Sequence, residues 1–368
     1  MKDFIPVNEP DLSGNEKKYL AECINTGWIS SEGPFVERFE SGMTELTNRK
    51  HAFAVCNGTA ALELAVKAVG ILPGDEVIIP SFTIISCAFA VVRAGATPVY
   101  VDADSHTWNM QVDQIKPLIT EKTKAIMAVH IYGLTADMDP LLRIAREYDL
   151  LVIEDAAEVI GQTYKGKPCG SFGDISTFSF YPNKHVTTGE GGMVVVNCDQ
   201  LADRCKSLRN LCFGKTDRFV HKDLGWNFRM SNLQAAVGVA QLEKLKVTVE
   251  KKRKIGKYYL EVFKGNELFQ LPLLKTAYCE NIFWVFGIIS KDKNKSAKYY
   301  MRKLSKICGT RPFFYPLHLQ PVLSGKGKQR SVLPVSENLA KQGFYLPSSS
   351  NLQLQEIEYF FEEILKIS

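Results

Sequence analysis

The sequence lacks the signals of several common protein classes. No apolar run reaches the roughly 20 residues that a membrane-spanning helix needs. Residues 1–14 show neither the apolar stretch of a signal peptide nor the Arg-rich, acid-poor bias of a transit peptide. The nine cysteines include no Cys-x-x-Cys pair and no histidine neighbour at zinc-ligand spacing. We therefore predict a cytoplasmic protein with free thiols, no membrane anchor and no metal site.

A large excess of charge of one sign is also missing. The net charge is only +5 over 368 residues, so no nucleic-acid partner follows. Basic runs at 251–254 and 291–298 lack the regular aromatics that would stack bases, and we interpret both as solvated helix faces or loops. The length predicts two domains.

Between residues 76 and 197, β-rich runs alternate with helical patterns such as the apolar stripe of 138–148. Several runs are apolar almost throughout, which is typical of strands buried on both faces of a parallel sheet. The predicted strands are 76–80, 97–102, 124–130, 150–155, 175–180 and 192–197.

The pattern changes after Gln234. A long helical segment, 235–263, is predicted to lead into a second unit with a strand at 283–289 and a helix at 296–308. We predict an α/β protein with a large, mostly parallel-sheet domain over 1–245, which includes an N-terminal arm, and a smaller α+β domain over 246–368.

Ligands of open α/β sheets gather at the carboxyl ends of strands, so polar groups that end apolar runs are the first candidates. Cys56-Asn57-Gly58-Thr59 follows one such run and precedes a helical segment. Backbone N–H groups, the positive end of the helix dipole and the Thr59 hydroxyl could bind a phosphate there. The pattern is also typical of a turn with a helix cap, so this segment alone leaves both interpretations open.

A second run ends at Glu154-Asp155. A carboxylate at this place could pair with a protonated heterocyclic nitrogen, but it could equally cap a helix or bind a metal. A third candidate is the stretch 176–192, STFSFYPNKHVTTGEGG. It places Lys184 between a strand and a Gly-rich turn, where partial burial would favour loss of its proton and hence Schiff-base chemistry.

The segments NGT, EDAA, STFSFYPNKHVTTGEGG, GWNFRMSNLQAAVG and RPFFYPLH occur together, in one order, over nearly the whole chain. In this they resemble the DegT/DnrJ/EryC1/StrS family of sugar aminotransferases. The resemblance implies the aspartate-aminotransferase fold (type I) and pyridoxal 5'-phosphate (PLP) as cofactor. It implies that Lys184 is the Schiff-base lysine and moves the proton, that Asp155 pairs with the pyridinium nitrogen, and that Glu158 lies near the ring hydroxyl.

The same resemblance implies further roles. Gly58, Thr59 and Ser179 match the groups that hold the cofactor phosphate, and Asn227 matches an asparagine that reaches this phosphate from a neighbouring subunit. The chain is therefore expected to form a homodimer with shared active sites. Ile84 occupies the position where most relatives stack Phe, Tyr or Trp on the cofactor ring, so an aliphatic side chain would have to cover that face.

Five more residues are candidates for substrate binding. Arg229 could place the substrate or the cofactor phosphate, although a loop arginine is often only solvated. The other four are candidates for the sugar-nucleotide site, with packing or a local hydrogen bond as the alternative: His130, Tyr132, Tyr315 and His318.

Within the family, the segments GWISSEGPFV, TWNM, GKPCGSFGDISTFSF, WNFRMSN and RPFFYPLH resemble those of GDP-perosamine synthases. This implies transfer of the amino group of L-glutamate to C4 of GDP-4-keto-6-deoxy-D-mannose. Amination of a dTDP- or UDP-linked 4-keto-6-deoxyglucose, as in viosamine synthesis, stays open, and amination at C3 is less favoured. Sugar 3-dehydration, which uses histidine in place of the lysine, and a non-catalytic regulatory role are the remaining alternatives.

Overall fold

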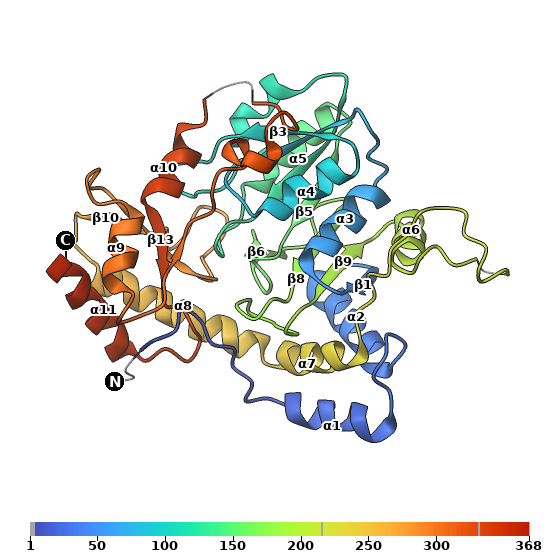
Figure 1. Ribbon diagram of the computed structural model, residues 1–368, viewed down its shortest axis with the longest axis horizontal. Coiled ribbons are helices and arrows are strands. Elements are labelled where there is room, and N and C mark those ends of the chain that lie inside the picture. The colour runs from blue at the N-terminus through green and yellow to red at the C-terminus, as the bar shows by residue number, and fades with distance from the viewer. Residues whose placement is uncertain (1–3, 215, 330–331, 368) are drawn as a thin grey trace.

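The computed structural model describes residues 4–214, 216–329 and 332–367 (Figure 1). Its centre is a seven-stranded sheet of β1 (His51–Val55), β2 (Glu76–Pro80), β3 (Thr97–Val101), β4 (Thr123–Val129), β5 (Leu151–Asp155), β8 (Ile175–Ser179) and β9 (Gly192–Val196). The spatial order is β1-β9-β8-β5-β4-β2-β3. Neighbouring strands are parallel except where β9 pairs with β1 and β8.

Helices cover both faces of this sheet. On one face, α3 (Gly58–Ala68), α4 (Ile85–Arg93) and α6 (Asp199–Arg209) share a core with alternate strand residues such as Val77 and Ile79. The other face packs against α1 (Glu16–Thr26), α2 (Pro34–Thr47), α5 (Met138–Glu147) and α7 (Asn232–Glu243). Because both sides are buried, the strands read as continuous apolar runs.

The C-terminal part begins along α8 (Leu245–Val262). It contains an antiparallel sheet of the order β10-β11-β13-β12, whose members are β10 (Phe269–Gln270), β11 (Phe286–Ser290), β12 (Arg311–Pro312) and β13 (Gly343–Leu346). Helices α9 (Ala297–Leu304), α10 (Pro334–Gln342) and α11 (Leu354–Ile367) accompany it. Aromatic side chains share the core of this part with isoleucines and leucines.

The predicted fold class is confirmed, and each of the six predicted strands overlaps an observed one. The helical segment 235–263 is two helices rather than one, because the chain turns at Lys244 between α7 and α8. The division at residues 245 and 246 stays a prediction. The N-terminal arm, assigned to the large domain, reaches the C-terminal part: Ile5 joins its aromatic core and forms a parallel bridge with Cys308.

The interpretation of 251–254 as a solvated face was wrong for one residue. Lys252 is only 4% exposed, and its Nζ donates to the carbonyl oxygens of Trp284, at 2.8 Å, and Ser348. Its place in the helical period of α8 turns it toward the C-terminal loops rather than to water. Within the described ranges, no helix combines the length and the apolar character that crossing a membrane requires.

Candidate active site

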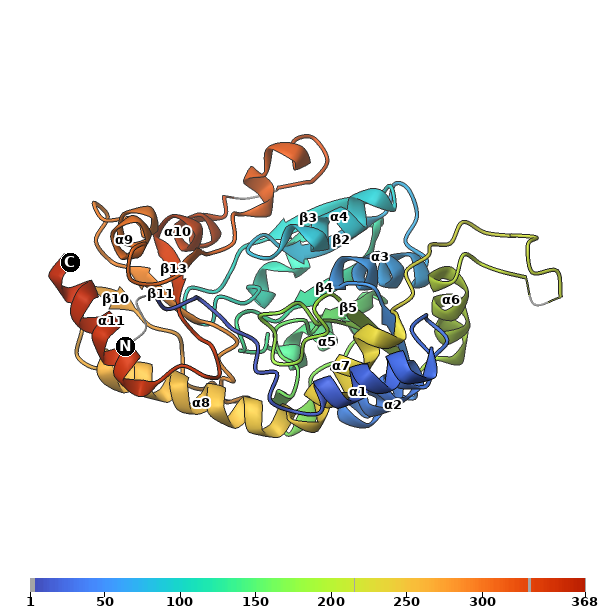
Figure 2. The same cartoon turned by 60° about the horizontal axis from the view of Figure 1, so that its bottom comes forward.

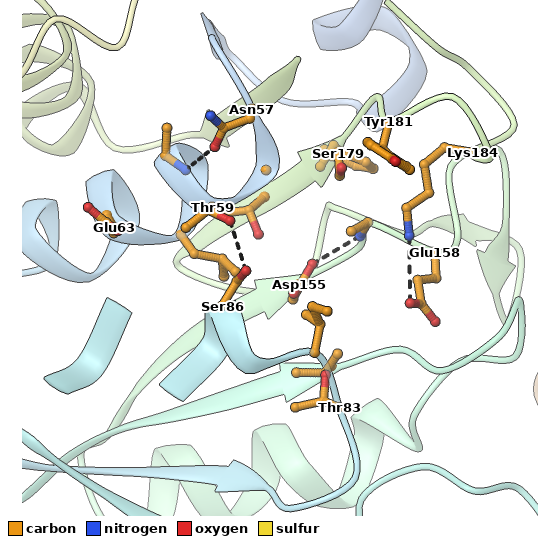
Figure 3. Close-up of a pocket in the computed structure, with 18 of the residues that line it drawn as sticks. Asn57, Thr59, Glu63, Thr83, Ser86, Asp155, Glu158, Ser179, Tyr181 and Lys184 are labelled. Carbon is orange, nitrogen blue, oxygen red and sulfur yellow. Dashed lines mark hydrogen bonds and ion pairs between the residues drawn. The ribbon is translucent and has the colours of Figure 1, made fainter. Parts of the chain in front are cut away.

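A cavity of ≈ 740 Å³ opens beside the carboxyl ends of β5 and β8 and the first turns of α3 and α4. This edge of the sheet is the usual place for a ligand in an α/β protein. Figure 3 shows side chains from these elements converging on the cavity. It brings together seven residues predicted from the sequence: Gly58, Thr59, Ile84, Asp155, Glu158, Ser179 and Lys184.

The N-terminus of α3 forms an anion cradle on one side of the cavity. Asn57 caps the helix by accepting a hydrogen bond from Ala60 N at 2.8 Å. Gly58 has no room for a side chain, because a Cβ there would lie 2.7 Å from Ser179 Cβ. Thr59 Oγ1 shares a hydrogen bond of 2.8 Å with Ser86 Oγ. Hydroxyl groups and helix N–H groups therefore face one small space, which suits a phosphate.

Asp155 lies at the end of β5 and is 2% exposed. Its Oδ1 accepts from Ala157 N at 3.0 Å, and its Oδ2 accepts from Cys87 Sγ at 3.4 Å. Burial raises the pKa of this carboxyl group, whereas the Ala157 amide and the Lys184 ammonium oppose the rise. A cationic ligand atom beside Asp155 would favour its ionised form.

Lys184 faces Asp155 and Glu158 from the loop that joins β8 to β9. Its Nζ lies 3.6 Å from Glu158 Oε1, and Glu158 Oε2 accepts from Tyr132 N at 2.8 Å. Burial lowers the pKa of the Lys184 amine. Burial also raises the pKa of the Glu158 carboxyl group to about 7, against the opposing effect of Lys184. A lysine that releases its proton readily is what nucleophilic amine chemistry requires.

The neighbouring His185 faces the other way. It is 3% exposed, its Nε2 lies 3.3 Å from Ile282 O, and it does not line the large cavity. Burial lowers the pKa of its imidazole to about 3. The residue that meets the cavity is therefore Lys184, which speaks against the 3-dehydratase alternative, where a histidine takes this place.

Glu154, next to Asp155, has a structural role. Its carboxylate accepts five hydrogen bonds, from His130, Ser176 and the amides of Gly170, Phe172 and Gly173. Burial would raise the pKa of this carboxyl group, but the His130 ring and the amides lower it to about 2. His130, Glu154 and Cys169 are close enough to share a metal ion. We interpret His130 and Glu154 as part of a hydrogen-bonded network that fixes the 170–176 turn, because both Glu154 oxygens already accept hydrogen bonds.

Comparison with known proteins agrees with this site. Residues 10–365 match the model of the DegT/DnrJ/EryC1/StrS aminotransferase family. This chain belongs to that family. The chain is 41% identical to a GDP-perosamine synthase of Escherichia coli O157:H7, over 98% of both chains. It is 40% identical to one of Vibrio cholerae, over 96% of this chain and 97% of the other.

Solved structures of the family share the fold. An aminotransferase of this family from Brucella abortus superposes with a TM-score of 0.88 at 29% identity, and the match covers 96% of this chain and 95% of the other. The protein is therefore a PLP-dependent transaminase with the fold that the sequence predicted.

The residues at the cavity fit PLP. The space that Gly58 leaves beside Ser179 and Thr59 can accept the phosphate, and Asp155 and Lys184 supply a carboxylate and an amine on the same wall. The buried Thr177 Oγ1 also lines the cavity and has no hydrogen-bond partner in the part of the chain that the structure describes. Buried hydroxyls are normally paired, so this atom is available to a ligand.

Six predicted residues lie outside the lining of this cavity. His130 is wholly buried, with Nδ1 accepting from Ala136 N at 3.0 Å, and Tyr132 is buried among aromatic rings. His318 is held by Ser81 Oγ at 2.6 Å and Glu337. In this structure these three side chains make packing contacts or local hydrogen bonds, and their part in substrate binding stays a prediction. Asn227, Arg229 and the 54% exposed Tyr315 face solvent at least in part.

Several cavity residues were not predicted: Thr83, Ser86, Tyr181, Asn183, Trp284 and Phe314. Ser86 follows Ile84 in the segment PSFTIIS, and a hydroxyl in the first turn of a helix was a signal that could have identified it. The sequence pattern predicts that Trp284 belongs to the strand 283–289. About 100 residues separate it from Lys184, and no local pattern indicates that the two meet.

Proposed function

We propose that this chain transfers the amino group of L-glutamate to C4 of GDP-4-keto-6-deoxy-D-mannose and so forms GDP-perosamine and 2-oxoglutarate. The observation that carries the proposal is the buried Lys184 amine, 3.6 Å from Glu158 and facing the same cavity as the anion cradle. The sugar is proposed from the full-length similarity to two GDP-perosamine synthases.

The roles of the residues follow from their places. Bound PLP supplies an electron sink and carries the amino group between the two substrates. Thr59, Ser179 and the first amides of α3 would bind its phosphate, and Asp155 would balance the positive charge of its ring nitrogen. Lys184 Nζ would hold the cofactor between turnovers and move the proton in both halves of the reaction. Glu158 orients this amine, and Ile84, on the cavity wall and 42% exposed, would cover one face of the ring.

We further propose that the enzyme is a homodimer in which Asn227 serves the cavity of the partner subunit. Asn227 is exposed, and its Oδ1 accepts from Arg229 Nε at 2.9 Å. The described residues between α6 and α7, 210–214 and 216–231, include this pair and in part project from the body of the subunit (Figure 2). Among them are Phe219 and Leu224, which are 78% and 85% exposed. An apolar surface of this kind is typical of an interface.

Arg229 and Tyr315 are proposed to contact the nucleotide sugar, since both have exposed surface. We place the reaction in the cytoplasm. All nine cysteines lie in the described residues and are free thiols, which suits a reducing compartment.

The test is turnover of the PLP-loaded protein with L-glutamate and a panel of GDP-, UDP- and dTDP-linked 4-keto-6-deoxysugars, with 2-oxoglutarate and product mass as readouts. We expect the GDP-linked manno sugar to be aminated with the highest kcat/KM. Preference for a dTDP or UDP sugar would replace the proposed substrate. Absence of amination at C4 with every sugar would overturn the proposal.

A further inference from the structure

Trp284 forms the wall of the cavity beside Lys184. It lies two residues before β11 and is 5% exposed. Lys184 Nζ lies 3.4 Å from the centroid of its ring. The electron-rich face of an indole attracts a cation at this distance, and the attraction is stronger where water is excluded.

Three contacts hold the indole in place. The indole Nε1 donates to Asn183 O at 2.7 Å, and the main-chain carbonyl oxygen of Trp284 accepts from Lys252 Nζ at 2.8 Å. Its ring packs against Tyr132, with 5.8 Å between the centroids. Because Asn183 immediately precedes Lys184, the Trp284 side chain both faces the amine and fixes the loop that carries it. No role in the reaction has so far been given to Trp284 or to Lys252.

Other groups also act on the Lys184 amine. Burial lowers its pKa, and Glu158 and Asp155 raise it. His185 is neutral near pH 7, because burial lowers its pKa to about 3. Lys252 lies behind Trp284, and burial lowers its pKa to about 7. Within the described residues, the cavity and its surroundings also hold Glu63, Arg93, Tyr132, Tyr181, Glu190 and Tyr345, with Cys87 beside Asp155. Glu9 and Asp11 of the N-terminal arm line a second, small cavity that Lys184, His185 and Lys252 also line.

We propose that Trp284 is a positioning residue of Lys184, in addition to Glu158: its indole face holds the protonated amine within the cavity whenever that amine is not covalently bound. This inference rests on the proposed function, in which Lys184 moves the proton. A free lysine side chain has several rotatable bonds and loses entropy when it is fixed. Proton transfer nevertheless requires the amine to stay within hydrogen-bond reach of its target. The indole contributes to this beside Glu158, and it does so without adding an ionisable group.

The test measures the protonation of Lys184 in the cofactor-free protein. Reductive methylation with formaldehyde and cyanoborohydride modifies only unprotonated amines, so the yield at Lys184 between pH 6 and 11, read by peptide mass spectrometry, gives its midpoint. We expect Trp284→Leu to lower this midpoint by on the order of half to one pH unit, because the attraction to the ring is lost. Trp284→Phe keeps an aromatic face, so its Lys184 midpoint should lie between those of the wild type and Trp284→Leu.

Trp108→Phe is the matched control. Trp108 is a buried tryptophan that packs on the same Tyr132 ring, with centroids 6.3 Å apart, but it does not line the cavity. The Lys184 midpoint in Trp108→Phe should equal that of the wild type. If Trp284→Leu does not fold, as judged by circular dichroism, the smaller fall in Trp284→Phe decides the question. A midpoint that stays at the wild-type value in the folded Trp284 variants overturns the inference.

The two proposals can fail separately. The methylation assay uses neither cofactor nor sugar. A midpoint that falls from the wild type through Trp284→Phe to Trp284→Leu therefore supports the role of Trp284 even if the preferred sugar is not the GDP-linked one. Loaded Trp284→Leu should also lose kcat while the KM for the sugar changes little, since the amine and not the sugar is displaced. An unchanged kcat would count against positioning.

Discussion

Lys184 and His185 are adjacent in the chain but have different surroundings. Lys184 is surrounded by two carboxylates and an indole ring, whereas His185 is buried against the carbonyl group of Ile282. At the scale of single residues, this difference decides which of the two can meet a cofactor. Residue type alone would have allowed either.

The first prediction concerns Lys184 itself. Lys184→Ala removes the amine that holds PLP and moves the proton, so we expect loss of the visible absorption of the bound cofactor and a fall in turnover of at least about 10³-fold. Absorbance spectra and 2-oxoglutarate release measure the two effects. Lys167→Ala, in the short strand β7 (Lys167–Pro168), is the control and should behave as wild type. Retained absorption in Lys184→Ala would refute the assignment.

A second prediction follows from Glu158, whose carboxyl pKa burial raises to about 7. Above this pH the group is ionised and attracts the Lys184 ammonium; below it the attraction disappears. The pH profile of kcat, which reports the state in which the Lys184 amine is free, should therefore bend near pH 7, and Glu158→Gln should remove this bend. The exposed Glu121→Gln should retain it. A profile that is the same in wild type and Glu158→Gln would exclude Glu158 as its source.

At the scale of elements, the first turn of α3 depends on close packing against β8. Gly58→Ala would place a Cβ 2.7 Å from Ser179 Cβ, and overpacking of this kind costs about 1–3 kcal/mol. We expect a lower melting temperature and weaker PLP binding by equilibrium dialysis. The double variant Gly58→Ala/Ser179→Gly lacks the clashing atom and should recover the melting temperature. If it does not, the strain lies elsewhere.

Helix α8 carries a buried cation, which makes stability depend on pH. Burial lowers the pKa of Lys252 to about 7 in the folded chain, against about 10.4 for an unfolded one. Between these values the unfolded chain binds more protons, so this lysine's contribution to stability rises with pH. The free energy of unfolding of the wild type, measured in urea, should rise relative to that of Lys252→Met by on the order of 2 kcal/mol from pH 7 to 9. Lys254→Met, on the exposed side of the helix, should show no such trend.

Elements were easier to predict than contacts between them. The predicted strands 150–155 and 175–180 identified part of the cavity, including Asp155 and Ser179, because parallel strands place their carboxyl ends at one edge. The Lys184 segment was identifiable because its residues are consecutive. Trp284 and Lys252 were not, since their meeting with the lysine loop depends on how α8 and β11 pack. A basic run has the same sequence pattern whether or not one of its members is buried.

At the scale of the whole molecule, the proposed dimer can be tested by mixing two inactive variants. Lys184→Ala retains Asn227, and Asn227→Ala retains Lys184. If each site draws on both subunits, one of the two sites of a mixed dimer has both groups. We expect activity to rise after the two are unfolded and refolded together, toward about a quarter of the wild-type value. Mixing Lys184→Ala with Asp155→Ala is the control, since both residues come from one subunit. If the activity of the Lys184→Ala and Asn227→Ala mixture does not exceed that of this control, the sites are not shared.

The N-terminal arm ties the earliest part of the chain to a much later one. Ile5 pairs with Cys308, Asn8 Nδ2 donates to Pro182 O in the lysine loop, and Glu9 O accepts from Ser349 Oγ. On the ribosome, residues near Ile5 leave the exit tunnel long before their partners exist, since synthesis adds about 5–20 residues per second. The lysine loop therefore gains its last support only when translation is nearly complete, and a nascent chain that stalls before residue 308 would hold its large sheet but not a finished catalytic loop.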